Sequence, residues 1–227
     1  KMAKSVDHVL ALLPFEPPYM QAEGMGCDFV GHPVVTEPQA TQAEIAALLA
    51  KYRLDDARKT ILVLPGSRRS EIDRLAPIFG ATLAPVLARH PTAQVILPAA
   101  PAVAAHLADK IADWPGAPVV LDPRDQAPDN FAAEKRAAFA LADVALAASG
   151  TVSLELAASQ TPMVIAYDMT KLSRWLVQSM LLVDTVTLVN LVAESRTVPE
   201  FIGKACRPAA IGAALNTLIE DDAARAA

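Results

Sequence analysis

The turn Ser149-Gly150-Thr151 contains the residues of this chain best suited to binding a phosphate. The apolar residues 144–147 before it predict a buried strand, residues 152–159 predict a helix, and residues 163–167 predict the next strand. A helix begins with unpaired N–H groups, glycine lets a ligand approach the backbone, and hydroxyl groups can donate hydrogen bonds. These features favour a bound phosphate, although a simple helix cap would show the same residues.

Glu155 follows one helical turn after Thr151 and shares its face of the predicted helix. Its carboxylate would repel a phosphate, but it could accept hydrogen bonds from paired hydroxyl groups such as those of a ribose. The turn and the glutamate together would suit a nucleotide. The alternative interpretation is a glutamate that lies in solvent after an ordinary helix cap.

A second turn, Gly66-Ser67-Arg68, also follows an apolar strand and leads into a predicted helix. In a doubly wound parallel sheet both turns lie along the carboxyl edge, where ligands bind. Arg68 could fork onto phosphate oxygens and neutralise charge on a leaving diphosphate. Its alternative is a surface arginine, which is also what we expect of Arg69.

The composition excludes several classes of protein. Of 227 residues, 53% are hydrophobic but only 5% are aromatic, so alanine-rich helices on a sheet are expected. A net charge of −5 without a long basic run argues against nucleic acid as a partner. Two cysteines, four scattered histidines and no Asp-x-Asp pair predict neither a disulfide framework nor a metal site. No apolar stretch reaches the length of a membrane span and no signal peptide is recognisable, so we expect a soluble protein of a reducing compartment.

Strand and helix patterns alternate along the chain, which predicts an α/β fold with a Rossmann-like, doubly wound parallel sheet. Expected strands cover residues 6–13, 27–30, 60–64, 94–97, 119–121, 144–147 and 163–167. Expected helices cover residues 41–52, 70–89, 102–113, 129–141, 152–159, 172–183 and 209–222. Thr41 and Glu44 form a capping box, Pro77 is expected to kink its helix or begin a new segment, and the adjacent Pro17 and Pro18 predict a loop over residues 14–18.

Five groups of short motifs, taken in order, resemble those of the lipid-A-disaccharide synthase family. They are Leu13-Pro14-Phe15-Glu16, Phe29-Val30-Gly31-His32-Pro33, Leu64-Pro65-Gly66-Ser67-Arg68 with Ser70-Glu71-Ile72, Ala148-Ser149-Gly150-Thr151 with Leu154-Glu155, and Pro162-Met163-Val164. Val198-Pro199-Glu200 also fits. Leu188-Val189-Asn190-Leu191 is a weaker match, because Val189 stands where the family pattern has proline.

The resemblance implies a GT-B glycosyltransferase, which has two Rossmann-like domains and reacts in the cleft between them. The family consists of inverting hexosyltransferases that need no cofactor. They transfer 2,3-diacylglucosamine from UDP-2,3-diacylglucosamine to lipid X (2,3-diacylglucosamine 1-phosphate), forming UDP and the β-1,6-linked lipid A disaccharide of lipopolysaccharide. The implied location is cytoplasmic, peripherally on the inner-membrane face of a Gram-negative bacterium.

The resemblance also implies how the chain is organised. Residues 1–40 would be a connection with the first strands, and residues 41–227 the UDP-sugar-binding Rossmann-like domain. The acceptor-binding N-terminal domain and the terminal tail of the family are absent from these residues. Since GT-B chemistry needs both halves of the cleft, we expect this segment alone to be inactive.

The family pattern assigns roles to individual residues. It implies Arg68 and Asn190 as catalytic residues, although chemistry alone says only that Asn190 could bond to a sugar or a phosphate. It implies a UDP site made of Gly66, Ser67, Arg68, Ser149, Gly150, Thr151 and Glu155. We expect His32 to stabilise a turn and Glu16 to brace the loop between the domains.

Two questions stay open at the level of sequence. The predicted helix 172–183 has a broad apolar face that could be ordinary core or a patch for acyl chains and the anionic membrane surface. The same fold would also serve a UDP-N-acetylglucosamine epimerase, a peptidoglycan glycosyltransferase or a noncatalytic nucleotide-binding module.

Overall fold

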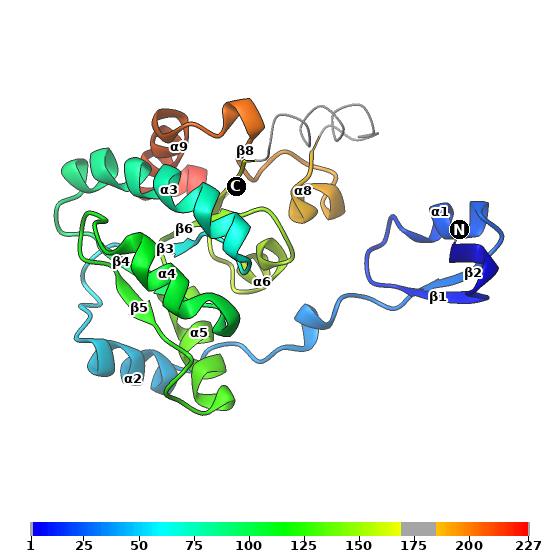
Figure 1. The fold of residues 1–227 in the computed structure, drawn as a ribbon, viewed down its shortest axis with the longest axis horizontal. Coiled ribbons are helices and arrows are strands. Elements are labelled where there is room, and N and C mark those ends of the chain that lie inside the picture. Colours follow the sequence, from blue (N-terminus) through cyan, green and yellow to red (C-terminus); the bar gives the residue numbers. More distant parts are fainter. Residues whose placement is uncertain (1, 169–184, 227) are drawn as a thin grey trace.

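A six-stranded parallel sheet forms the centre of the protein, with strand order β5-β4-β3-β6-β7-β8 (Figure 1). The computed structural model describes residues 2–168 and 185–226. The strands are β3 (Thr60–Leu64), β4 (Gln94–Pro98), β5 (Val119–Leu121), β6 (Val144–Ala148), β7 (Met163–Tyr167) and β8 (Glu200–Ile202). The first five confirm the predicted strands to within one residue, whereas β8 was not predicted from the sequence.

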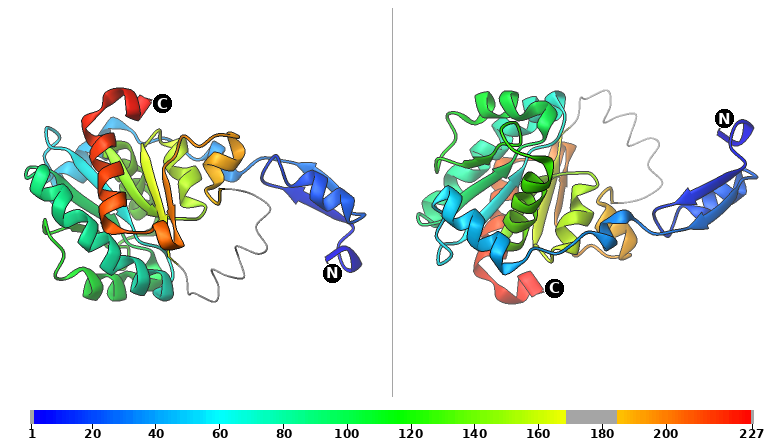
Figure 2. Two further views of the ribbon diagram at one scale, coloured as in Figure 1. Left: turned by 90° about the horizontal axis from the view of Figure 1, so that it is seen from above. Right: turned by 90° about the horizontal axis from the view of Figure 1, so that it is seen from below.

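Helices cover both faces of this sheet, as Figure 2 shows. One face packs against α3 (Arg69–Arg89), α4 (Ala104–Ile111) and α9 (Pro208–Glu220), and the other against α2 (Gln42–Tyr52), α5 (Pro128–Leu141) and α6 (Val152–Ala158). Alternate residues of β3 enter the two cores, Ile61 and Val63 on the first face and Leu62 and Leu64 on the second. This arrangement confirms the doubly wound Rossmann-like fold.

Several helices differ from the prediction in their continuity. Helix α3 runs without interruption through Pro77 and Pro85, so Pro77 does not begin a new segment. Its fully buried side chains, which include Leu75 and Phe79, pack on the sheet and outweigh the hydrogen bonds that proline removes. The helix predicted over residues 102–113 is a 3-10 turn, η3 (Pro101–Val103), followed by α4. The last predicted helix divides into α9 and α10 (Asp222–Ala226).

The N-terminal residues form a separate unit beside the main body (Figure 1). After η1 (Met2–Lys4), strands β1 (His8–Ala11) and β2 (Gly26–Phe29) pair in parallel, and α1 (Pro17–Ala22) connects them. The predicted loop over residues 14–18 is therefore wrong at its end. Pro17 and Pro18 occupy the first turn of α1, where a missing N–H costs no intrahelical hydrogen bond.

A connection leads from this unit to the main body through η2 (Pro33–Thr36) and residues 37–40. The predicted capping box then starts α2, because Glu44 N donates to Thr41 Oγ1 at 3.2 Å and Thr41 N donates to Glu44 Oε2 at 2.8 Å. Further along the chain, α8 (Leu188–Val192) precedes β8, and η4 (Gly203–Ala205) follows it.

Helix α2 is joined to α5 by a polar cluster around Glu134. Tyr52 Oη and Gln126 Nε2 donate to its carboxylate at 2.9 Å and 3.1 Å, and Lys51 forms an ion pair with it. Burial raises the pKa of the Glu134 carboxyl, but these three hydrogen bonds outweigh burial and hold the pKa below its ordinary value.

Within the described ranges 2–168 and 185–226, no helix has both the length and the apolar character needed to cross a membrane. The predicted amphipathic helix 172–183 lies outside the described residues.

The close packing of α3 against Trp114 gives a test of the core. A Cβ atom on Gly80 would lie 2.7 Å from Trp114 Nε1 and 2.8 Å from Trp114 Cδ1. We expect Gly80→Ala to lower the free energy of unfolding, measured by urea denaturation, by about 1–3 kcal/mol through overpacking. In the control Gly212→Ala, the new Cβ would lie 3.5 Å from Val86 Cγ2, an ordinary contact, and helix propensity predicts a gain of up to about 1 kcal/mol. Equal effects of the two substitutions would contradict this account of the packing.

Candidate nucleotide site

The two glycine turns lie side by side because the strands before them are neighbours. Leu64 of β3 pairs with Ala147 of β6, and both strands run in the same direction. The turns that follow therefore meet at the carboxyl edge of the sheet, where the strand order changes direction. Together they line a cavity of about 460 Å³, which we call the nucleotide cavity. Its lining includes all seven residues predicted for UDP, namely Gly66, Ser67, Arg68, Ser149, Gly150, Thr151 and Glu155.

The glycines of the two turns differ in what a side chain at their position would meet. Gly66 has a φ of +118°, and a Cβ there would lie 2.7 Å from both Cβ and Oε2 of Glu71. At Gly150 no heavy atom lies within 4 Å of the position that a Cβ would take, apart from the residue itself and its chain neighbours. A side chain at Gly66 would disturb the turn, whereas a side chain at Gly150 would occupy open space in the cavity wall.

Glu71 braces the first turn, a role that the sequence analysis missed. Its carboxylate accepts hydrogen bonds from Ser67 N at 3.0 Å, from Arg68 N at 3.2 Å and from Arg68 Nη1 at 2.8 Å. The backbone N–H of Ser67, one of the residues predicted for UDP, is therefore already used within the turn. A glutamate at the third position of a helix is a signature of N-terminal capping. This signature could have revealed the contact.

Arg68 keeps most of its side chain free for a ligand. The side chain is 77% exposed, and within the described residues its ion pair is the single contact from Nη1 to Glu71. The remaining guanidinium N–H groups are thus available at the cavity. Arg69 is also exposed but does not line the cavity, as expected for a solvated residue.

The second turn offers two hydroxyl donors. Ser149 is half-buried and Thr151 is exposed, and within the described part of the chain neither hydroxyl makes a side-chain hydrogen bond. Ser153 Oγ donates to the carbonyl oxygen of Gly150 at 2.9 Å, which holds the turn against the start of α6. The turn thus presents two free hydroxyl groups on a braced backbone.

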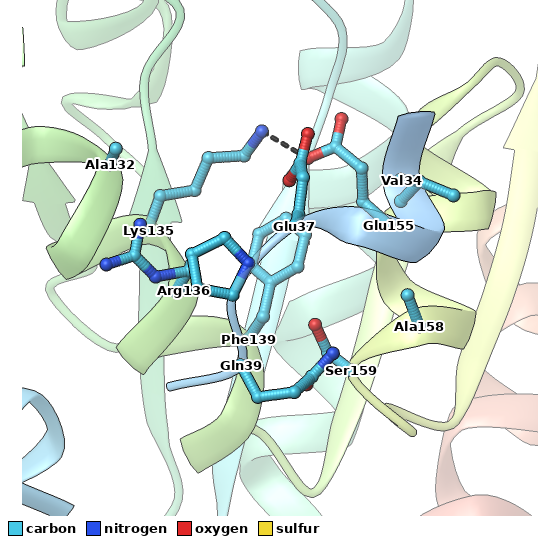
Figure 3. Close-up of a pocket in the computed structure, with 11 residues that line it drawn as sticks. Val34, Glu37, Gln39, Ala132, Lys135, Arg136, Phe139, Glu155, Ala158 and Ser159 are labelled. Atoms are coloured by element: carbon cyan, nitrogen blue, oxygen red, sulfur yellow. Dashed lines mark hydrogen bonds and ion pairs between the residues drawn. The ribbon is translucent and has the colours of Figure 1, made fainter. Parts of the chain in front are cut away.

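Glu155 forms an ion pair with Lys135 of α5, which sequence reasoning did not single out. Figure 3 shows the two side chains reaching toward each other across a second cavity, of about 260 Å³. The second cavity lies between α5, α6 and the connection residues Glu37, Pro38 and Gln39. Glu155 is therefore not the solvated glutamate of the simpler interpretation.

Asn190 lies elsewhere and has a different set of partners. Its side chain is completely buried and does not line the nucleotide cavity. Asn190 Nδ2 donates to Val198 O at 2.9 Å, and Val198 N donates to Asn190 Oδ1 at 3.0 Å. The geometry does not support the predicted contact of Asn190 with a substrate, because both polar atoms already hold the loop before β8.

Glu16 and His32, which we expected to have structural roles, both accept hydrogen bonds from nearby backbone. Glu16 Oε2 accepts hydrogen bonds from Leu12 N at 3.0 Å and from Leu13 N at 2.9 Å, which closes the loop after β1. His32 Nδ1 accepts a hydrogen bond from Val34 N at 3.2 Å and caps η2. Across residues 2–168 and 185–226, no three His, Cys, Asp or Glu side chains are placed to hold a metal ion.

Solved structures with this architecture define the class of protein. The S. aureus MnaA-UDP co-structure has a TM-score of 0.63 and 16% sequence identity, covering 96% of this chain and 52% of that one. The E. coli ADP-heptose lps heptosyltransferase II has a TM-score of 0.55 and 13% identity, covering 81% and 53%. At such identities the likeness shows the fold alone, which is one Rossmann-like half of a GT-B protein.

Sequence relatives narrow this class to one family. Residues 1–227 match the family model described as Lipid-A-disaccharide synthetase. The lipid-A-disaccharide synthase of Ruegeria pomeroyi is 60% identical over 225 residues, covering 99% of this chain and 56% of the relative. That of Rhodospirillum centenum is 42% identical and covers 99% and 54%. The chain belongs to the lipid-A-disaccharide synthase family of glycosyltransferases, and it spans about half the length of these relatives.

The buried contacts of Asn190 predict a role in stability. Asn190→Ala would leave the N–H and C=O groups of Val198 without partners, so we expect the free energy of unfolding to fall by about 2–3 kcal/mol. Asn190→Asp keeps the acceptor but places a buried carboxylate oxygen against the carbonyl oxygen of Val198, so it should lose at least as much. Denaturation curves of the three proteins would measure this. Unchanged stability of Asn190→Ala, combined with lost activity of the intact enzyme, would instead favour the catalytic role.

Proposed function

We propose that this chain is the UDP-binding half of an inverting enzyme that makes the lipid A disaccharide. The donor would be UDP-2,3-diacylglucosamine and the acceptor lipid X, with UDP and the β-1,6-linked disaccharide as products. The observation that carries the proposal is the single cavity shared by Gly66-Ser67-Arg68 and Ser149-Gly150-Thr151. The relatives named lipid-A-disaccharide synthase support this choice of substrates.

Each part of UDP would meet a different part of the cavity. The diphosphate would lie between the turns, where hydroxyl groups would donate hydrogen bonds and Arg68 would oppose its negative charge. Glu155 would accept hydrogen bonds from the ribose hydroxyls. Arg68 would also stabilise the charge that develops on UDP as the sugar leaves, which is the step that positive charge accelerates. The bond from the sugar to the acceptor forms on the opposite face of the anomeric carbon, so the configuration inverts.

The acceptor and its base would lie in the other half of the cleft. We propose that residues 41–227 form the UDP-sugar domain and that residues 1–40 lead into it from the acceptor-binding half. The first unit supports this division because it is a two-stranded sheet, which is marginal alone, with exposed apolar side chains at Leu10, Tyr19 and Phe29. The whole enzyme would work in the cytoplasm, peripherally on the inner-membrane face where its acylated substrates reside.

The family match favours this reading over its rivals. It extends over residues 1–227, whereas the solved structures share only the fold. A UDP-N-acetylglucosamine epimerase, a peptidoglycan glycosyltransferase or a noncatalytic nucleotide-binding module would each leave that match unexplained.

Substitution of Arg68 tests the proposed charge stabilisation. In the intact enzyme, Arg68→Ala should lower kcat by about two to three orders of magnitude, the usual effect of losing a donor to a developing charge. Arg68→Lys should recover only part of the rate, because the forked geometry is lost. Arg69→Ala is the matched control and should leave kcat nearly unchanged, since Arg69 is exposed and outside the cavity. A folded Arg68→Ala enzyme with normal turnover would refute the assignment.

A polypeptide of residues 1–227 should bind UDP weakly and form no disaccharide. Binding is expected because the predicted UDP contacts all lie within it, and inactivity because general-base help and acceptor binding would come from the other half. Calorimetry with UDP and a disaccharide assay with both lipid substrates would measure the two properties. Product above background would mean that the base lies within these residues and that the proposed division between the halves is wrong.

A further inference from the structure

Two side chains form a shared wall between the two cavities of the main body. Lys135 and Glu155 are the residues common to the lining of the nucleotide cavity and of the second cavity behind it. They come from different helices, α5 and α6, and meet as an ion pair (Figure 3). Any ligand group that reaches Glu155 from the nucleotide cavity therefore meets a carboxylate that is already held from its other side.

The surroundings of this pair restrict its movement. The side chains of Lys135 and Glu155 are 34% and 26% exposed, so each is partly withdrawn from water. The ammonium group of Lys135 also lies 5.3 Å from the centre of the Phe139 ring, one helical turn further along α5. The connection residues Glu37 and Pro38 line the far side of the second cavity. Lys135 is thus directed toward Glu155 by the packing around it.

The pairing leaves one oxygen of Glu155 for a ligand. Lys135 Nζ contacts Oε2, and Oε1 has no hydrogen bond from any side chain within the described ranges. An ionised carboxylate next to a diphosphate would be repelled by it, and it would otherwise turn toward solvent. The positive charge of Lys135 offsets this repulsion and keeps the carboxylate in the cavity wall.

We propose that Lys135 is a positioning residue that holds Glu155 in place to accept hydrogen bonds from the ribose hydroxyls. Lys135 thereby makes the site prefer a ribonucleotide over a nucleotide without those hydroxyls. This inference rests on the proposed function, because it takes UDP as the ligand. It assigns to Lys135 an effect through Glu155, without a contact to the nucleotide itself.

The test compares UDP with 2′,3′-dideoxy-UDP by calorimetry on the intact protein. The unaltered protein should bind UDP at least about tenfold more tightly, because the analogue lacks the hydrogen bonds to a charged group. Lys135→Met should weaken UDP binding by about tenfold and leave binding of the dideoxy analogue unchanged. Lys135→Arg should restore most of the preference, since it keeps the positive charge. Lys135→Met combined with Glu155→Gln should be no weaker than Glu155→Gln alone.

Lys51→Met is the matched control. Lys51 also forms an ion pair with a glutamate of α5, Glu134, but neither side chain lines a cavity of the nucleotide site. Its loss should change neither affinity. If Lys135→Met fails to fold, Lys135→Gln replaces it, with the same expected ratio between the two nucleotides.

The outcomes separate this inference from the proposed function. An unaltered protein that does not bind UDP would overturn both. A protein that prefers UDP, with Lys135 variants that keep the full preference, would overturn the role of Lys135 alone. Equal losses for UDP and for the dideoxy analogue would also overturn it, because they would indicate a direct phosphate contact or a general effect on the fold.

Discussion

Hydrogen bonding between the backbones of β3 and β6 is the contact on which the candidate site depends. The register that pairs Leu64 with Ala147 brings the two strand ends to the same height in the sheet. Each strand then ends in a glycine turn and is followed by a helix that returns along one face. Helix α3 returns along one face and α6 along the other, so the space between the two turns stays open and becomes the nucleotide cavity.

The two turns share a second feature, which is a glutamate in the following helix paired with a cation. Glu71 pairs with Arg68, and Glu155 pairs with Lys135. Carboxylates beside a phosphate site would oppose an anionic ligand if they stood alone. Paired in this way, they brace the site without adding net negative charge, and the N–H groups of Arg68 that Glu71 leaves unpaired can donate hydrogen bonds to a diphosphate.

The connection between the two units is part of this arrangement. Val34 of η2 is buried, and residues 37–39 lie against α5 and α6 at the second cavity. The same ion pair that borders the nucleotide cavity also borders this one. The path of the chain into the main body therefore lies at the back of the site, where it borders the same cavity as Lys135 and Glu155.

The sequence by itself determined five strands of the main sheet and both turns of the site, because local patterns decide them. Apolar runs located β3, β5 and β7 to the residue, and glycine, serine and threonine marked both turns of the site. Local rules failed where the effect of a residue depends on its position within an element. Pro17 and Pro18 begin a helix that we expected them to prevent.

Only the tertiary structure decided which charged and polar groups have partners. Lys135 and Glu155 lie on different helices, and nothing in the spacing of a sequence reveals that such side chains meet. Asn190 matched a family motif, yet both polar atoms of its side-chain amide form hydrogen bonds with the backbone of Val198. Whether a polar side chain serves a ligand or the fold depends on where its hydrogen bonds go, and burial in three dimensions decides that.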